Sequence, residues 1–227
     1  MATERADVRV TSLMRRALIA GTAAAVLATG AGSAVAAPTP GTATAAAART
    51  STATPGRGTV VGAPGASAGQ LRALVALAAE RLATADPVAA AKWGTGSPID
   101  DPAREQQVLA DVAAQARALG ADPDATVRVF RDQIEASKLV QRGLHRRWTA
   151  DPAQAPTTRP DLAQVREEIN RINGELVRAL AASPRARTAP GCTPRLAADA
   201  LQLSHRHHLD ALHTAGLARA LRSVCGA

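Results

Sequence analysis

Apolar residues recur at helical spacing from about Gln70 to the C-terminus, and no segment shows the strict alternation of a β-strand. The first periodic segment runs from Gln70 to Trp93, with apolar residues at positions i, i+3, i+4 and i+7. Pro87 lies inside this segment and has no backbone N–H to donate, so we expect a kink near 83–86 rather than the end of the helix. The pattern therefore predicts one long, bent helix at the start of the folded region.

Three further helices each follow an aspartate that is placed to cap them. After Asp101 and Asp122 the next residue is proline, which suits the first helical position because its missing N–H has no helical partner there. The third aspartate, Asp161, precedes a stripe of leucine, isoleucine and valine at helical spacing. The sequence predicts these helices over 102–119, 124–148 and 162–180.

Two proline-containing segments, 151–160 and 183–190, are expected to be connectors, and 194–224 predicts one or two terminal helices. Much of the hydrophobic content is alanine, with one Phe and no Tyr, which argues against a sandwich or barrel. We therefore expect an all-α fold, a single helical-bundle domain of about five to six helices over 68–227. Residues 37–67 are rich in Pro, Thr, Gly, Ala and Ser and predict a disordered linker before it.

Residues 1–36 have the features of a signal peptide. An arginine pair precedes an apolar run over 17–29, and small residues then end in an A-x-A cleavage site. The run is too weakly apolar to remain in a bilayer, so we expect secretion without stable membrane association once the peptide is removed. Acidic residues within 1–13 are unusual in such a leader, which indicates that Met14 is the true start. The arginine pair leaves twin-arginine export open beside ordinary secretion, which is the default.

Export also bears on the two cysteines, Cys192 and Cys225, because an oxidising compartment allows them to pair. A disulfide that closes a loop of about 34 residues would stabilise the fold by roughly 3–4 kcal/mol. Two free buried thiols are the alternative, and that state fits a cytosolic protein.

The chain is strongly basic, with a net charge of +8, which raises nucleic acid as a partner. The arginines are, however, spread among Asp and Glu without a block of five like charges, and aromatic residues that could stack on bases are nearly absent. We therefore expect no nucleic-acid partner. Only two of the 27 basic residues are lysines, Lys92 and Lys138, which hints that a compact ammonium group is needed in the polar cluster described next.

Polar side chains interrupt the apolar pattern at spacings that place them on common helix faces. Arg81 and Lys92 are separated by about three helical turns, so both cations project from one face. Ser137 and Gln141 are one turn apart and share a face in the same way. Two carboxylates lie on the helix between these pairs, Asp101 and Glu105. Such a set suits a small polyanionic ligand that also carries a hydroxyl group.

The order of these residues resembles the all-helical (AroQ-type) chorismate mutases. The positions that carry the resemblance are Arg81, Lys92, Trp93, Asp101, Arg104, Glu105, Ser137 and Gln141. Over residues 70–225 the chain is similar to their secreted, signal-peptide-bearing gamma class. The resemblance implies an enzyme that rearranges chorismate to prephenate outside the cytoplasm, the chemistry of aromatic amino-acid biosynthesis. It also implies that this enzyme needs no cofactor or metal and forms a homodimer.

The resemblance also implies a role for each position. The implied catalytic residues are Arg81, Lys92, Glu105 and Gln141, and the further substrate-binding residues are Asp101, Arg104, Ser137 and Arg166. In this comparison Lys92 and Gln141 reach the ether oxygen, the arginines and Ser137 bind carboxylates, and the two acidic residues contact the substrate hydroxyl. Arg166 replaces an arginine that the minimal members take from a partner chain. Arg171 and Arg178 are the alternatives on the same predicted helix.

Plainer interpretations stand beside this one. Taken singly, each of these polar residues would be a solvated or ion-paired surface group. A secreted helical binding protein for another anionic metabolite or for a protein partner would use the same scaffold. The histidine-rich run offers His205, His208 and Asp210 as metal ligands, but Arg206 separates the histidines and no second ligand cluster is present. We therefore expect no metal site.

Overall fold

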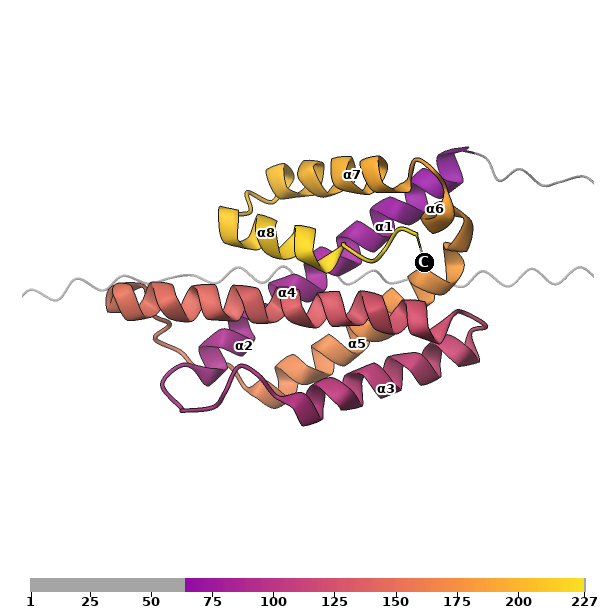
Figure 1. Ribbon diagram of the computed structural model, residues 1–227. Helices are drawn as coiled ribbons and strands as arrows, with labels where there is room; N and C mark the ends of the chain where they lie inside the picture. The colour runs from indigo at the N-terminus through magenta and orange to yellow at the C-terminus, as the bar shows by residue number, and fades with distance from the viewer. Residues whose placement is uncertain (1–63, 227) are drawn as a thin grey trace, which may run out of the picture. The chain divides into compact units, whose positions relative to one another are not determined.

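The computed structural model describes residues 64–226, and within this range the chain forms helices and no β-strand (Figure 1). Its elements in order are α1 (Pro64–Ala83), α2 (Ala85–Lys92), α3 (Pro102–Ala118), α4 (Pro123–Ala150), the 3-10 helix η1 (Pro152–Gln154), α5 (Leu162–Ala182), α6 (Pro184–Thr188), α7 (Cys192–Arg206) and α8 (Ala211–Ala220). The all-α prediction is confirmed. The signal peptide predicted over 1–36 lies outside the described residues, as does the predicted linker up to residue 63.

The described region holds more helices than the five to six that the sequence predicts. The two predicted connectors contain the short helices η1 and α6, and the predicted first helix is divided into α1 and α2. α1 also begins at Pro64, so residues 64–67 belong to a helix rather than to the expected linker. Proline suits the first turn of a helix and alanine favours its interior, so this segment can be helical without adding an apolar stripe.

The division between α1 and α2 lies where the sequence predicts a kink. Thr84 interrupts the helix, although its φ of −70° and ψ of −11° remain in the right-handed helical region. Its backbone N–H and its hydroxyl both donate to the carbonyl of Arg81, at 3.2 and 2.7 Å. Pro87 has no N–H to give to the carbonyl four residues earlier, so the regular pattern fails at this point. The bend brings the end of α1 and the end of α2 to the same region of the molecule.

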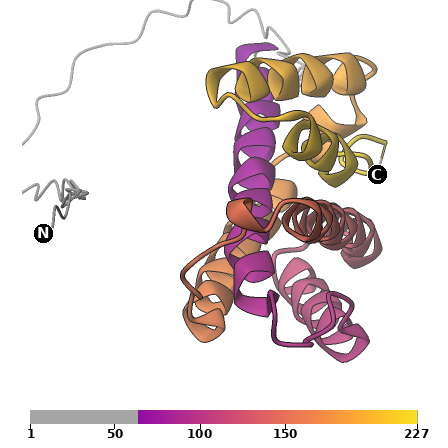
Figure 2. The ribbon, with the colours of Figure 1, turned by 90° about the vertical axis from the view of Figure 1, so that its left-hand side faces the viewer.

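The 28-residue α4 is the central helix of the described region. α3 and α8 pack on opposite sides of it, while α1 packs against α5 and α7 (Figures 1 and 2). Phe130 on α4 and Leu74 on α1 are completely buried, and such side chains each contribute about 1.5–3 kcal/mol to folding. Buried alanines such as Ala89 and Ala136 allow the helices to approach closely. The core therefore follows from the Ala, Leu and Val content of the sequence.

The C-terminal segment is fastened to α6 and α7. Cys192 and Cys225 form a disulfide with a Cα–Cα distance of 5.8 Å, which confirms the predicted pairing. Arg187 on α6 donates from Nε to the carbonyl of Val224 at 2.9 Å. Among residues 64–226, no helix is both long and apolar enough to cross a membrane.

Candidate active site

The helices enclose a cavity of about 120 Å³ between α1, α2, α3, α4, α5 and the loop that joins α2 to α3. It is lined by Arg81, Val88, Lys92, Ile99, Asp101, Arg104, Glu105, Val108, Ile134, Ser137, Lys138, Gln141, Leu162, Arg166 and Ile169. All eight residues that the sequence comparison links to substrate binding are in this lining. Five helices thus bring together side chains that are as far apart in the chain as Arg81 and Arg166.

Arg81 lies in the last turn of α1 and is 6% exposed. Its Nε donates to Asn173 Oδ1 on α5 at 2.8 Å, and a terminal nitrogen donates to the carbonyl of Gln133 on α4 at 3.2 Å. The guanidinium carbon also lies 5.8 Å from the centre of the Phe130 ring. Burial lowers the pKa of Arg81 to about 10, so the group remains charged at neutral pH. These contacts fix the guanidinium in place, and its remaining N–H groups are available to an anion.

Lys92 is the last residue of α2, at the opposite end of the bend from Arg81. Its Nζ donates to the carbonyl of Ile99 in the α2–α3 loop at 3.1 Å. Burial lowers the pKa of Lys92, and the nearby Arg166 adds to this effect, while Asp101 opposes it. An anionic ligand would therefore strengthen the charged form of this ammonium group.

The N-cap and the first turn of α3 supply the two carboxylates of the lining. Asp101 caps the helix, since its side chain accepts from the backbone N–H of Arg104 at 3.1 Å. The Arg104 guanidinium is held by Asn170 on α5 at 3.1 Å. Glu105 accepts from Lys138 Nζ, which lies 3.2 Å from each of its oxygens. Hydrogen bonds therefore hold Asp101, Arg104 and Glu105 in place where the N-terminus of α3 lines the cavity.

Ser137 and Gln141 share the face of α4 that lines the cavity, as their spacing predicts. Gln141 Nε2 donates to Ser137 Oγ at 3.0 Å, and the Gln141 side chain is almost fully buried. Its Oε1 is buried and has no hydrogen-bond partner among the described residues. The amide is thus held at the cavity wall with hydrogen-bonding capacity that the protein does not use.

Of the three candidate arginines on α5, only Arg166 lines the cavity. Its side chain makes no hydrogen bond or ion pair with the residues that the structure describes, so its donors are free for a ligand. Arg171 instead forms an exposed network with three glutamates, and the hydrogen bonds that it donates to these carboxylates raise its pKa. Arg178 is exposed and lies outside the lining.

The lining combines five cationic side chains and two carboxylates with an apolar wall. The wall includes Ile134 on α4 and the half-buried Leu162 and Ile169 on the first half of α5. A cavity of this kind suits a compact anion with an apolar body, and its cations exceed its carboxylates by three. The arrangement offers positioning and electrostatic stabilisation, and its side chains include no serine–histidine or cysteine–histidine pair.

The sequence did not predict the contacts of three residues that hold the site in place. Asn173 and Gln133 hold Arg81, and Lys138 holds Glu105. The only sequence signals were a buried-stripe asparagine on α5 and the rarity of lysine. Neither signal shows that Asn173 would contact Arg81 or that Lys138 would contact Glu105.

The histidine-rich run forms a separate cluster away from this lining. His213 bonds through Nδ1 to Asp210 at 2.6 Å and through Nε2 to Asp86 at 2.9 Å. Among residues 64–226, no group of three or more His, Cys, Asp or Glu residues is placed to hold a metal ion.

Comparisons with known proteins agree with the geometry of the cavity. Residues 72–142 match the family model for chorismate mutase type II. The chain is 38% identical over 158 residues to the secreted chorismate mutase of Mycobacterium tuberculosis, covering 70% of this chain and 79% of that protein. It is 39% identical over 168 residues to the secreted chorismate mutase of Mycolicibacterium smegmatis, covering 73% and 93%. A crystal structure of chorismate mutase from Burkholderia thailandensis has 40% identity and a TM-score of 0.66, covering 69% of this chain and 99% of that one.

Proposed function

Because the chain belongs to the secreted, all-helical chorismate mutases, we propose that the cavity between α1 and α5 is the site where it isomerises chorismate to prephenate. The observation that carries this assignment is the meeting of all eight expected residues in one lining. No observation on the described residues favours the alternative of a binding protein without catalytic activity.

The reaction is a pericyclic rearrangement, so it needs no nucleophile and no covalent intermediate. The enzyme must hold a flexible dicarboxylate in a compact shape and stabilise the negative charge that develops on the breaking ether oxygen. A lining with five cations and fixed hydrogen-bond donors supplies both requirements. The apolar wall supports the same role, since it limits water around the reacting carbons.

We assign the carboxylates of the substrate to the arginines and Ser137. Arg81 is fixed from behind by Asn173 and Gln133, so its free N–H groups form a rigid donor for one carboxylate. Arg104 on α3 and Arg166 on α5 would bind the second carboxylate, with Ser137 as an additional donor.

The ether oxygen is assigned to Lys92 and Gln141, and the hydroxyl group to the start of α3. Lys92 has one protein acceptor, the Ile99 carbonyl, so two of its three N–H groups remain for substrate. Gln141 has a second amide hydrogen beyond the one given to Ser137. Asp101 and Glu105 lie at the N-terminus of α3, where they would contact the hydroxyl group. Lys92, Gln141, Arg81 and Glu105 are the proposed catalytic residues.

Membership of this family also supports export of the protein and the formation of a homodimer. The two mycobacterial relatives are secreted proteins by name, and the disulfide fits an oxidising compartment. We propose that residues 1–36 are the signal peptide that directs this export and that the mature chain is a homodimer.

The test is the loss of chorismate absorbance with the chain purified from residue 37 onward. Wild type should form prephenate, and Lys92→Ala should lower kcat/KM by about two or more orders of magnitude, as for a lost electrostatic donor. Arg166→Ala should also weaken activity strongly, whereas Arg171→Ala, a matched change on the exposed face of α5, should not. A folded wild type without turnover would contradict the function, and full activity in Lys92→Ala would contradict the site.

A further inference from the structure

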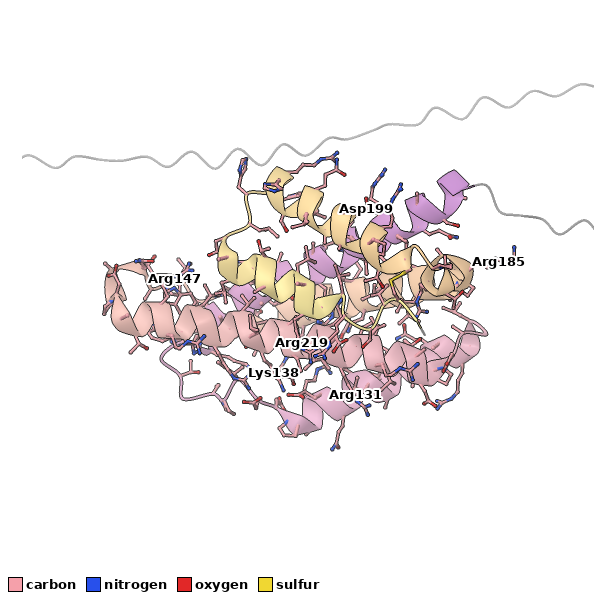
Figure 3. All side chains as sticks on the ribbon, turned by 45° about the horizontal axis from the view of Figure 1, so that its top comes forward. Arg131, Lys138, Arg147, Arg185, Asp199 and Arg219 are labelled. Atoms are coloured by element: carbon pink, nitrogen blue, oxygen red, sulfur yellow. A yellow bond between two sulfur atoms is a disulfide. The ribbon has the colours of Figure 1, made fainter. Side chains whose placement is uncertain are left out.

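Lys138 is the cation of the lining to which the family comparison gives no role. It lies on α4 beside Ser137, on the side that faces α3, and is 9% exposed (Figure 3). Its Nζ is 2.6 Å from a Glu135 oxygen, 3.2 Å from an Asp100 oxygen and 3.2 Å from both Glu105 oxygens. One ammonium group therefore joins three carboxylates from the α2–α3 loop, α3 and α4.

These contacts use the full donor capacity of the side chain. An ammonium group has three N–H donors and no acceptor, and Lys138 has three carboxylate partners. Lys92 differs, because one carbonyl is its hydrogen-bond acceptor among the described residues. The two lysines of the chain therefore differ in their free N–H donors: Lys92 has donors left for a ligand, and Lys138 has none.

We propose that Lys138 is a positioning residue for the rearrangement, whose ammonium group holds the Glu105 carboxylate in the orientation that receives the substrate hydroxyl group. This inference rests on the proposed function of the cavity. Lys138 does not itself touch the substrate, and its effect on the reaction passes through Glu105.

The charge balance around Lys138 explains why Glu105 needs this partner. Asp100, Glu105 and Glu135 all lie within ion-pair distance of one ammonium group, so they would repel one another without it. Glu105 is partly exposed, and its side chain could then turn toward solvent and away from the cavity. Burial acts to lower the pKa of Lys138, but hydrogen bonds to the three carboxylates outweigh burial and raise it, so the group stays charged.

Lysine suits this position better than the arginine used almost everywhere else in the chain. The three carboxylates come from three elements, the α2–α3 loop, α3 and α4, and together they can use the three tetrahedrally arranged donors of an ammonium group. A guanidinium presents its donors in one plane and would lose at least one of these partners. Replacement by arginine should therefore restore the charge without restoring the geometry.

A double-mutant cycle in the mature enzyme tests the inference. Lys138→Met and Glu105→Gln should each lower kcat/KM by about 10- to 100-fold. If Lys138 only attracted the dianion, its loss would mainly raise KM, so we expect Lys138→Met to lower kcat as well. If Lys138 acts through Glu105, adding Lys138→Met to Glu105→Gln should have little further effect. Losses that multiply independently would overturn the inference while leaving the proposed site intact. Full activity in Glu105→Gln would contradict both the positioning role of Lys138 and the proposed role of Glu105 in the site.

Two further variants separate positioning from charge and from folding. Arg142 donates to both Asp100 oxygens at 2.6 and 2.8 Å and has no bond to Glu105, so Arg142→Met should leave kcat/KM nearly unchanged. An equal loss in Arg142→Met and Lys138→Met would point to the loop rather than to Glu105 and would overturn the inference. Lys138→Arg keeps the charge, and we expect it to fold like wild type, as judged by its melting temperature, and still to have lowered kcat/KM. Wild-type activity in Lys138→Arg would overturn the need for three tetrahedral donors.

Discussion

Gln141 lies on α4 with 4% of its surface exposed, and its amide nitrogen donates to Ser137 at the wall of the cavity. An amide donates a hydrogen bond at any pH, whereas a carboxyl group donates only while it is protonated. A glutamate at so buried a position would have a raised pKa, yet it would still lose its proton as the pH rises. In the proposed site, where Gln141 donates to the ether oxygen, the identity of this side chain therefore sets the pH range over which that oxygen can be stabilised.

We predict that wild-type kcat/KM shows no collapse between pH 5 and 8 from this group, while Gln141→Glu loses activity as the pH rises. At the upper end of the range the variant should be reduced by about 10²- to 10³-fold, the usual effect of one lost oxyanion donor. The measurement is kcat/KM for both proteins across the range. A steep fall in wild type that is unchanged in Gln141→Glu would contradict this assignment.

At the residue scale the sequence predicted which side chains line the cavity but not what holds them. Ser137 and Gln141 lie one turn apart on the uninterrupted helix α4, so helical spacing alone predicts their shared face. Arg81 and Lys92 lie on separate helices, α1 and α2, and the bend between those helices contributes to their meeting at the cavity. The partner of Arg81 is Asn173, which is 92 residues away on another helix. Periodicity within a helix contains no information on which helices become neighbours. The contacts of Lys138 escaped prediction for the same reason.

At the scale of the elements, one histidine links α8 to α2, and its partner Asp210 links α8 to α4. His213, in the first turn of α8, bridges Asp210 at the start of that helix and Asp86 in α2, and Arg147 on α4 also binds Asp210. Burial acts to lower the pKa of His213, but hydrogen bonds to Asp86 and Asp210 outweigh it and raise the pKa. A raised pKa means that protonation favours the folded state. This stabilisation is complete below the ordinary histidine pKa of about 6.5 and is lost as the pH rises through the raised value.

We predict that His213→Ala lowers the melting temperature more at pH 6 than at pH 9. The substitution keeps the backbone N–H that caps α8 through Asp210, so it tests the imidazole alone. His205→Ala, at an exposed position on α7, is the control and should change melting little at either pH. An equal loss of stability at both pH values would show that the imidazole contributes by packing and not by its charge.

The helices themselves were predictable wherever a cap and an apolar stripe coincide. Asp101, Asp122 and Asp161 all accept backbone hydrogen bonds at the starts of α3, α4 and α5, as the sequence predicts. α6 was missed because it has only five residues and begins at Pro184, which leaves too short a segment for a periodic pattern. The sequence predicted a kink near Thr84, and the structure instead has a break between two helices there. Pro87 shows that a backbone donor is missing, but it does not show how far the chain turns.

At the scale of the whole molecule, every residue of the proposed site belongs to one chain. α1 to α5 enclose the cavity, and Arg166 on α5 is part of its lining. In the proposed site Arg166 takes the place of the cation that the minimal enzymes of the family receive from a partner chain. A dimer of this protein would therefore join two sites that are each complete. Its interface would affect stability and concentration dependence without completing the chemistry.

Two measurements follow from a site contained in one chain. Activity per chain should stay constant when the mature enzyme is diluted, even where light scattering shows that any dimer has separated, because no catalytic group is lost on separation. Mixing Lys92→Ala chains with Arg166→Ala chains should likewise restore no activity, since both residues must act in the same cavity of the same chain. A site built from two chains would behave differently, because a mixed dimer would carry one intact set of residues and would regain part of the wild-type rate. Recovery of activity on mixing, or a loss of activity on dilution in step with dimer separation, would contradict the single-chain site.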